Sequence, residues 1–154
     1  MFTRPGRLVG LLLVVALVVA ACSGTSQADD PCEKITVEDA FVRVPPGANT
    51  AVYATIVNGS DTEIALEGAT SDFAGAYELH ESIMKDDQMI MRPVEGQRIV
   101  IPPGGKVALA PGGMHVMAIG VSEELAEGDT VSMTLRFSGG CEKVVDAPVK
   151  AIGG

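Results

Sequence analysis

Both histidines of the chain stand close to methionines, and this combination of side chains could bind a metal ion. His115 lies in the stretch PGGMHVMAIG, where a Pro-Gly-Gly turn precedes a run of small and apolar residues. Side chains alternate between the two faces of a β-strand, so a strand that begins at this turn places His115 and Met117 on one face. Met114 and Val116 then occupy the other face. The spacing predicts that an imidazole and a thioether project in the same direction.

The other histidine, His80, lies in ELHESIMKDDQMIMRPV, which we interpret as two strands of a hairpin joined at residues 85–88. The expected cross-strand pairs are Met84 with Met89 and Ser82 with Met91. His80 is then diagonal to Met91 on the same face, and diagonal neighbours are about 7 to 8 Å apart. Long side chains at these two positions can reach a shared ion.

Together these side chains form a soft set of metal donors. Two thioethers and two imidazoles without a carboxylate favour Cu(I) over calcium, magnesium or manganese. In an oxidising compartment methionine has a further advantage as a sulfur ligand, because it cannot form a disulfide. The predicted copper ligands are His80, Met91, His115 and Met117.

Three more methionines lie near these ligands, namely Met84, Met89 and Met114. Met84 and Met89 are each either an auxiliary ligand or a hairpin packing residue, whereas for Met114 a place in the core is favoured over a role as an auxiliary ligand. Methionine is a common filler of protein cores, and an isolated histidine is more often a structural residue than a ligand. The occurrence of both histidines beside same-face methionines favours a metal site over packing.

The N-terminus has the pattern of an export signal. Two arginines precede an apolar run over residues 8–20, which is too short for a good membrane-spanning helix and ends in small residues. The sequence VAAC resembles a bacterial lipobox, which predicts a lipoprotein signal over residues 1–21 and lipidation of Cys22. An ordinary signal with a chance cysteine is the alternative. With residues 22–31 as a polar tether, we expect an extracytoplasmic protein anchored to the cell membrane.

Charge and cysteine content support the same compartment. Residues 22–154 contain 9 basic and 20 acidic residues, a formal charge of −11, which argues against binding to nucleic acid. Cys32 and Cys141 lie far apart in the sequence of an exported chain, so we predict a disulfide between them. A thiol copper or redox site is the weaker alternative, because neither cysteine belongs to a Cys-x-x-Cys pair.

Turn sequences such as Pro-Pro-Gly and Pro-Gly-Gly recur at short intervals between β-branched or alternating segments. No segment after the signal shows a convincing helical period. The pattern predicts an all-β fold, an antiparallel Greek-key sandwich or barrel formed as a single domain by residues 32–151. The expected strands are residues 35–44, 51–57, 64–69, 76–83, 88–92, 98–101, 106–109, 114–121, 131–137 and 142–149.

The order of the predicted ligands resembles that of the PCuAC family of extracytoplasmic copper chaperones. The resemblance rests on His80, Met91 and the pair His115-x-Met117, within the motifs ELHE, MRPVEG and PGGMHVM. Ten residues separate the first histidine from the first methionine, as in the family. The following gap is 23 residues instead of about 21, which predicts two extra residues around positions 97–101.

The resemblance implies a cupredoxin-like or immunoglobulin-like β fold that binds Cu(I) at the four matching residues. It also implies that the copper passes to a partner, such as a respiratory cytochrome oxidase subunit or another copper chaperone. Met114 stands where the family usually has an aromatic residue, which bears on how the copper is shielded.

Other functions have less support in the sequence. A blue-copper site needs a cysteine thiolate beside two histidines, and no histidine follows Cys141. The chain has no Gly-x-Ser-x-Gly, no His-Glu-x-x-His and no glycine-rich phosphate loop before a helix, so we do not expect an enzyme. The remaining alternative is a lipid-anchored β-sandwich that acts as an adhesion or interaction module without a metal.

Overall fold

The computed structural model describes residues 30–152. The predicted signal at 1–21, the lipidation site Cys22 and all but the last two residues of the tether lie outside this range. The described residues form ten β-strands and three short 3₁₀ helices, which confirms the all-β prediction. Within the same range, no helix is long and apolar enough to cross a membrane.

The observed strands follow the predicted segments closely. They are β1 (Ile35–Arg43), β2 (Asn49–Asn58), β3 (Ile64–Thr70), β4 (Ala74–Lys85), β5 (Gln88–Pro93), β6 (Ile99–Ile101), β7 (Lys106–Leu109), β8 (Met114–Val121), β9 (Thr130–Phe137) and β10 (Glu142–Lys150). The 3₁₀ helices are η1 (Pro31–Lys34), η2 (Glu95–Gln97) and η3 (Ser138–Gly140). The largest difference is at β4, which extends two residues beyond the predicted segment at each end.

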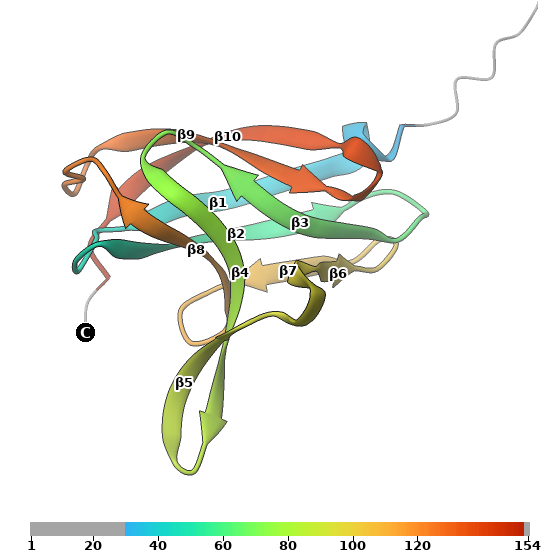
Figure 1. Cartoon of the computed structure of the whole chain (residues 1–154). Helices are drawn as coiled ribbons and strands as arrows, with labels where there is room; N and C mark the ends of the chain where they lie inside the picture. Colours follow the sequence, from blue (N-terminus) through green and yellow to red (C-terminus); the bar gives the residue numbers. More distant parts are fainter. Residues whose placement is uncertain (1–29, 153–154) are drawn as a thin grey trace, which may run out of the picture.

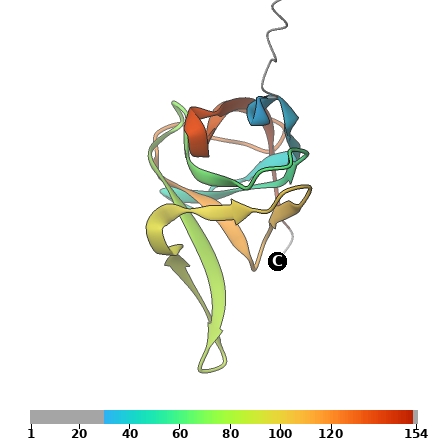
Figure 2. The same ribbon diagram turned by 90° about the vertical axis from the view of Figure 1, so that its right-hand side faces the viewer.

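The strands form one sheet in the order β5-β4-β8-β2-β1-β10-β9-β3-β6, and β7 pairs with β2. The sheet curls over itself and encloses the core, as the view in Figure 2 shows. Residues of β2 and β8, such as Ile56 and Val116, therefore share one core cluster with Leu66 of β3 and Leu135 of β9. This arrangement confirms the predicted cupredoxin-like sandwich.

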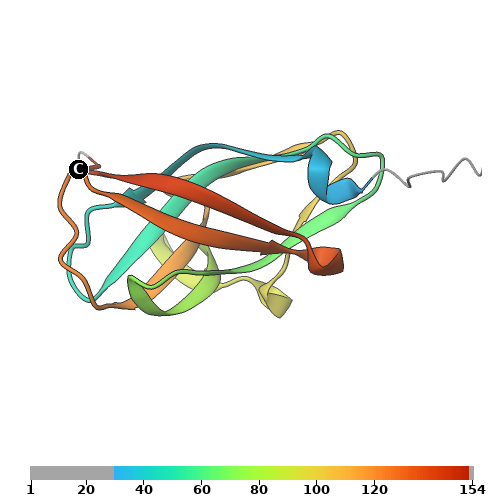
Figure 3. The same ribbon diagram turned by 90° about the horizontal axis from the view of Figure 1, so that it is seen from above.

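One strand pair departs from the predicted antiparallel pattern. β1 and β10 run parallel, with Val42 opposite Val149, and Figure 3 shows them side by side. Parallel neighbours need a long connection instead of a tight turn. β1 and β10 are the first and last strands, and nearly the whole described chain connects them. Turn sequences indicate only which consecutive strands form hairpins, so they did not predict this pairing.

The β4–β5 hairpin projects from the body of the molecule (Figures 1 and 2). β4 pairs with β8 only as far as Glu81, and the rest of the strand pairs with β5 alone. Asp86 and Asp87 close the hairpin with φ angles of 50° and 60°, the backbone of a type I′ turn, which aspartate tolerates. This turn produces the predicted register, in which Met84 faces Met89.

The predicted disulfide is present at one end of the fold. Cys32 in η1 is bonded to Cys141, which follows η3, and their Cα atoms are 5.5 Å apart. The bond joins the start of β1 to the connection between β9 and β10. Because both sulfurs are bonded to each other, neither is a thiolate ligand for a metal.

Candidate metal centre

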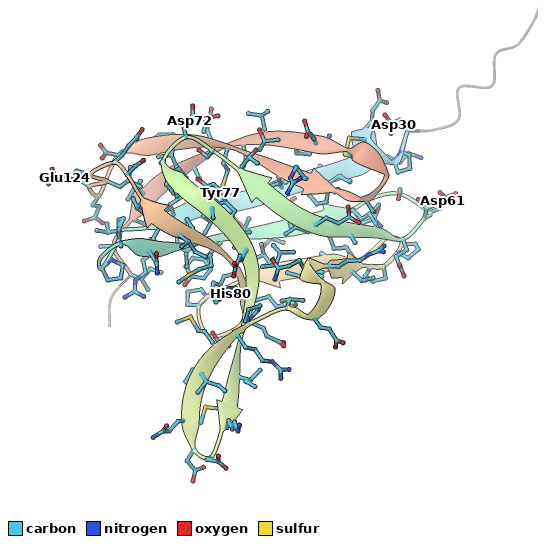
Figure 4. All side chains as sticks on the ribbon, in the orientation of Figure 1. Asp30, Asp61, Asp72, Tyr77, His80 and Glu124 are labelled. Carbon is cyan, nitrogen blue, oxygen red and sulfur yellow. A yellow bond between two sulfur atoms is a disulfide. The ribbon has the colours of Figure 1, made fainter. Side chains whose placement is uncertain are left out.

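The two histidines are direct neighbours on adjacent strands. His80 of β4 is paired with His115 of β8, and the centroids of their rings are 5.9 Å apart. Figure 4 shows His80 at the point where the hairpin leaves the body of the molecule. The pairing brings together two imidazoles that are 35 positions apart in the sequence.

Hydrogen bonds fix which nitrogen of each ring carries the proton. His80 Nε2 lies 2.9 Å from Oε2 of Glu78, and His115 Nδ1 lies 3.2 Å from the carbonyl oxygen of Gly113. A carboxylate and a carbonyl only accept hydrogen bonds, so each of these ring nitrogens donates its N–H. In the neutral form of each ring, the other nitrogen, Nδ1 of His80 or Nε2 of His115, therefore carries a lone pair.

Both of these lone-pair nitrogens lack a partner. Nδ1 of His80 and Nε2 of His115 are buried, and neither has a hydrogen-bond partner among the described residues. A buried polar atom without a partner costs about 1 to 3 kcal/mol, so a pair of them in one place calls for an explanation. A metal ion bound to both nitrogens would satisfy them, because neutral imidazole ligates through its lone pair.

Burial also favours the uncharged form of His115. Only 2% of this residue is exposed, and desolvation lowers the pKa of its imidazole, an effect that the hydrogen bond to Gly113 opposes and the charge of His80 reinforces. A lowered pKa favours the neutral ring, which is the form that binds metals.

Sulfur donors lie on the same face as the imidazoles. Met117 is two positions from His115 on β8, and Met91 of β5 is opposite Ser82, two positions from His80. A pocket of about 240 Å³ opens at this face. Its lining includes Arg43, Tyr53, Met89, Met91, His115 and Met117. The structure thus brings three of the four predicted ligands to one pocket and places His80 beside it.

The three further methionines have different surroundings. Met89 lines the pocket, whereas Met84 lies farther out on the hairpin, opposite Met89, and is not part of the lining. Met114 is on the other face of β8 and packs against the hydrophobic core. This position faces away from the two imidazoles, so a side chain at position 114 does not shield them.

Two further side chains of the site were not predicted from the sequence. Glu78 orients His80, and its position two residues earlier on the same strand face was a usable signal. Tyr53 of β2 lies with its ring centroid 6.1 Å from that of His115 and supplies an aromatic wall. No local pattern pointed to Tyr53, because it comes from a strand 62 positions earlier in the sequence.

The segment after β5 supports the backbone next to His80. The side chain of Gln97 accepts a hydrogen bond from the N–H of Leu79 at 2.7 Å and donates one to the carbonyl of Leu79 at 3.0 Å. β5 ends opposite His80, so Leu79 has no residue of β5 beside it. The two hydrogen bonds with Gln97 take the place of those that a neighbouring strand would form. Gln97 lies in the region where the sequence predicts two extra residues, and that length difference stays a prediction.

Nitrogen and sulfur dominate the donors at this site. Within residues 30–152, no group of three or more histidine, cysteine, aspartate or glutamate side chains is placed to hold a metal ion. The donors on this face are the two imidazoles and the thioethers of Met91 and Met117. Such donors suit a soft monovalent ion better than a hard divalent one.

Comparison with known proteins relates the chain to a lipoprotein family. Residues 35–149 match the family described as "Putative lipoprotein LpqE-like". The chain is 37% identical over 142 residues to "Putative lipoprotein Lxx21020" of Leifsonia xyli subsp. xyli, covering 91% of this chain and 81% of that protein.

Two solved structures are similar in fold and sequence. The copper-bound PCuAC domain from PmoF2 matches with a TM-score of 0.64 and 28% identity, over 77% of this chain and 94% of that chain. The solution structure of CuI-DR1885 from Deinococcus radiodurans matches with a TM-score of 0.59 and 34% identity, over 75% of this chain and 78% of that chain. The protein therefore belongs to the LpqE-like lipoprotein family, and its described part is a PCuAC-type domain.

Proposed function

We propose that this protein is an extracytoplasmic chaperone that binds one Cu(I) ion and delivers it to a partner. The observation that carries the proposal is the pair of buried, partnerless imidazole nitrogens on His80 and His115. The ligands are Nδ1 of His80, Nε2 of His115 and the sulfurs of Met91 and Met117. The copper-bound forms of two similar structures support the choice of metal.

The ligands differ in exposure, and this suggests the order in which they exchange. His115 is buried, whereas 60% of Met91 is exposed to solvent. A thioether is neutral and a weak donor, so Met91 is the ligand that an incoming group of the recipient replaces first. Glu78 meanwhile holds the ring of His80 in place, as outer-shell carboxylates do for metal-bound imidazoles.

The N-terminal pattern and the chemistry of the cargo support the proposed location and partner. The predicted signal at 1–21, lipidation at Cys22 and the lipoprotein relatives support anchoring to the outer face of the cell membrane. The disulfide fits an oxidising compartment. A recipient in that compartment would be a copper-requiring protein, such as a cytochrome oxidase subunit or another copper chaperone.

Titration of the mature chain with Cu(I) against a chromophoric chelator tests the proposal. We expect one tightly bound ion per chain, with X-ray absorption showing both nitrogen and sulfur ligands. An apo oxidase subunit added afterwards should gain the copper. A chain that leaves all the copper with the chelator would contradict the chaperone and favour the adhesion or interaction module.

The affinity for Cu(I) should fall in acid. Cu(I) and a proton compete for the same lone pair of His115. Because burial lowers the pKa of this residue below the ordinary value of about 6.5, protons compete with the metal only at a lower pH. Below that pKa, protonation of His115 weakens binding by up to about tenfold per pH unit. Chelator competition at several pH values would measure this, and equal affinity above and below the measured pKa of His115 in the metal-free chain would contradict imidazole ligation.

The same shift affects the stability of the metal-free protein. Unfolding exposes His115, whose ordinary pKa returns, so below about pH 6.5 the unfolded chain binds more protons than the folded one. The contribution of His115 to stability is therefore full above this pH and declines as the pH falls.

A further inference from the structure

Three methionines on the hairpin are unusually exposed. The exposed fractions of Met84, Met89 and Met91 are 62%, 56% and 60%. Burying a methionine contributes about 1.5 to 3 kcal/mol, and the hydrophobic effect explains why Met133 is buried in the core. Packing does not explain the three on the hairpin.

The other face of the same hairpin has ordinary packing. Ile83 and Ile90 are paired there and are half-buried, and Glu81 forms an ion pair with Arg92 at 2.9 Å. Apolar contacts that stabilise the hairpin thus come from the isoleucines. The methionine face contributes little to stability, which leaves its sulfurs available for another role.

The exposed methionines form a compact triangle. Met84 is directly opposite Met89, and Met91 lies two positions along β5 on the same face. Paired residues have Cβ atoms about 4.5 to 5.5 Å apart and diagonal ones about 7 to 8 Å apart, distances that flexible methionine side chains can close around one ion. The adjacent turn exposes two carboxylates, of Asp86 and Asp87, which attract cations to the tip.

We propose that Met84, Met89 and Met91 form a second, weaker Cu(I) site, through which the ion enters and reaches the buried imidazoles. The inference rests on the proposed copper binding and adds the route by which the ion reaches the buried site. Met91 belongs to both sets of ligands, so it stays bound while the sulfurs of Met84 and Met89 leave and the imidazole nitrogens replace them. The ion remains Cu(I) throughout, and only ligands are exchanged.

The direction of transfer follows from the donors. Three neutral thioethers hold Cu(I) more weakly than a donor set that also includes imidazoles, because a thioether is a weak donor. The buried site adds two imidazoles whose lone pairs lack any other partner among the described residues. Capture on the hairpin raises the local concentration of the ion near the buried site, as a tethered ligand does.

The replacement Met84→Leu tests this route, because Met84 does not line the pocket of the buried site. The matched control is Ile83→Leu, the adjacent position on the opposite face. We expect Met84→Leu to slow Cu(I) transfer from a chelator complex into the chain by about tenfold, with the equilibrium affinity of the first ion unchanged. The control should transfer copper at the wild-type rate.

Methionine methyl NMR separates the two sites. With Ag(I) as a redox-stable substitute, the first equivalent should shift the signals of Met91 and Met117, and further Ag(I) should shift those of Met84 and Met89, the two sulfurs of the entry site that the first ion leaves free. In His115→Ala, the shifts of Met84 and Met89 should persist, which tests the entry site independently of the buried one. Unchanged signals of Met84 and Met89 in excess Ag(I), or an unchanged transfer rate in Met84→Leu, would overturn the inference.

Discussion

Replacing His115 with alanine is expected to weaken Cu(I) binding by more than about 100-fold. Loss of an outer-shell partner of a metal-bound imidazole typically costs about 10- to 100-fold in affinity, and His115 is proposed as a direct ligand. Its Nε2 is one of the two partnerless nitrogens, so the variant removes half of the nitrogen donor set. Chelator competition on the mature chain measures the change.

Met114→Leu is the matched control for this experiment. Met114 is adjacent to His115 but lies on the opposite face of β8, against the core, so its replacement should leave copper affinity unchanged. Met117→Leu nearly preserves side-chain volume and should weaken binding even if His115→Ala folds poorly. Wild-type affinity in both His115→Ala and Met117→Leu would remove the basis for a metal at this site.

Copper binding at this site should also affect the stability of the folded protein. The fold buries two imidazole nitrogens without partners, which lowers the stability of the apo protein. A ligand that binds only the folded state restores stability in proportion to the logarithm of its free concentration over Kd. Copper should therefore raise the unfolding temperature of the wild type and have a much smaller effect on His115→Ala.

Local parts of this site were predictable from the sequence. Alternation along β8 placed His115 with Met117, and the turn at Asp86 and Asp87 set the register that pairs Met84 with Met89. Both inferences depend only on residues within one strand or one hairpin. The same is true of the strand positions, which the Gly and Pro turns delimit.

Non-local contacts were not predictable in this way. The pairing of His80 with His115 depends on β4 lying beside β8, which the resemblance to the PCuAC family implied but no local pattern required. Tyr53 reaches the pocket from β2, and the parallel pairing of β1 with β10 joins the two ends of the domain. These contacts arise from the packing of the whole sheet. The periodicity of a single strand shows which residues share a face but does not show which strands become neighbours.

Removal of the disulfide is expected to lower the free energy of unfolding by about 4 to 5 kcal/mol. The pair Cys32→Ser and Cys141→Ser releases a loop closed across 109 positions, and the unfolded chain gains the corresponding conformational entropy. Urea denaturation monitored by circular dichroism would measure the change, with Cys22→Ser in both proteins so that no free thiol remains.

Copper affinity should respond differently from stability in this variant. The bond joins η1 to the segment after η3, whereas the proposed ligands lie on β4, β5 and β8, so the folded variant should keep its affinity. A loss of less than about 1 kcal/mol would mean that the constraint on the unfolded chain is offset by strain in the folded one. Weaker copper binding by fully folded protein would instead show that the disulfide helps to hold β4 against β8.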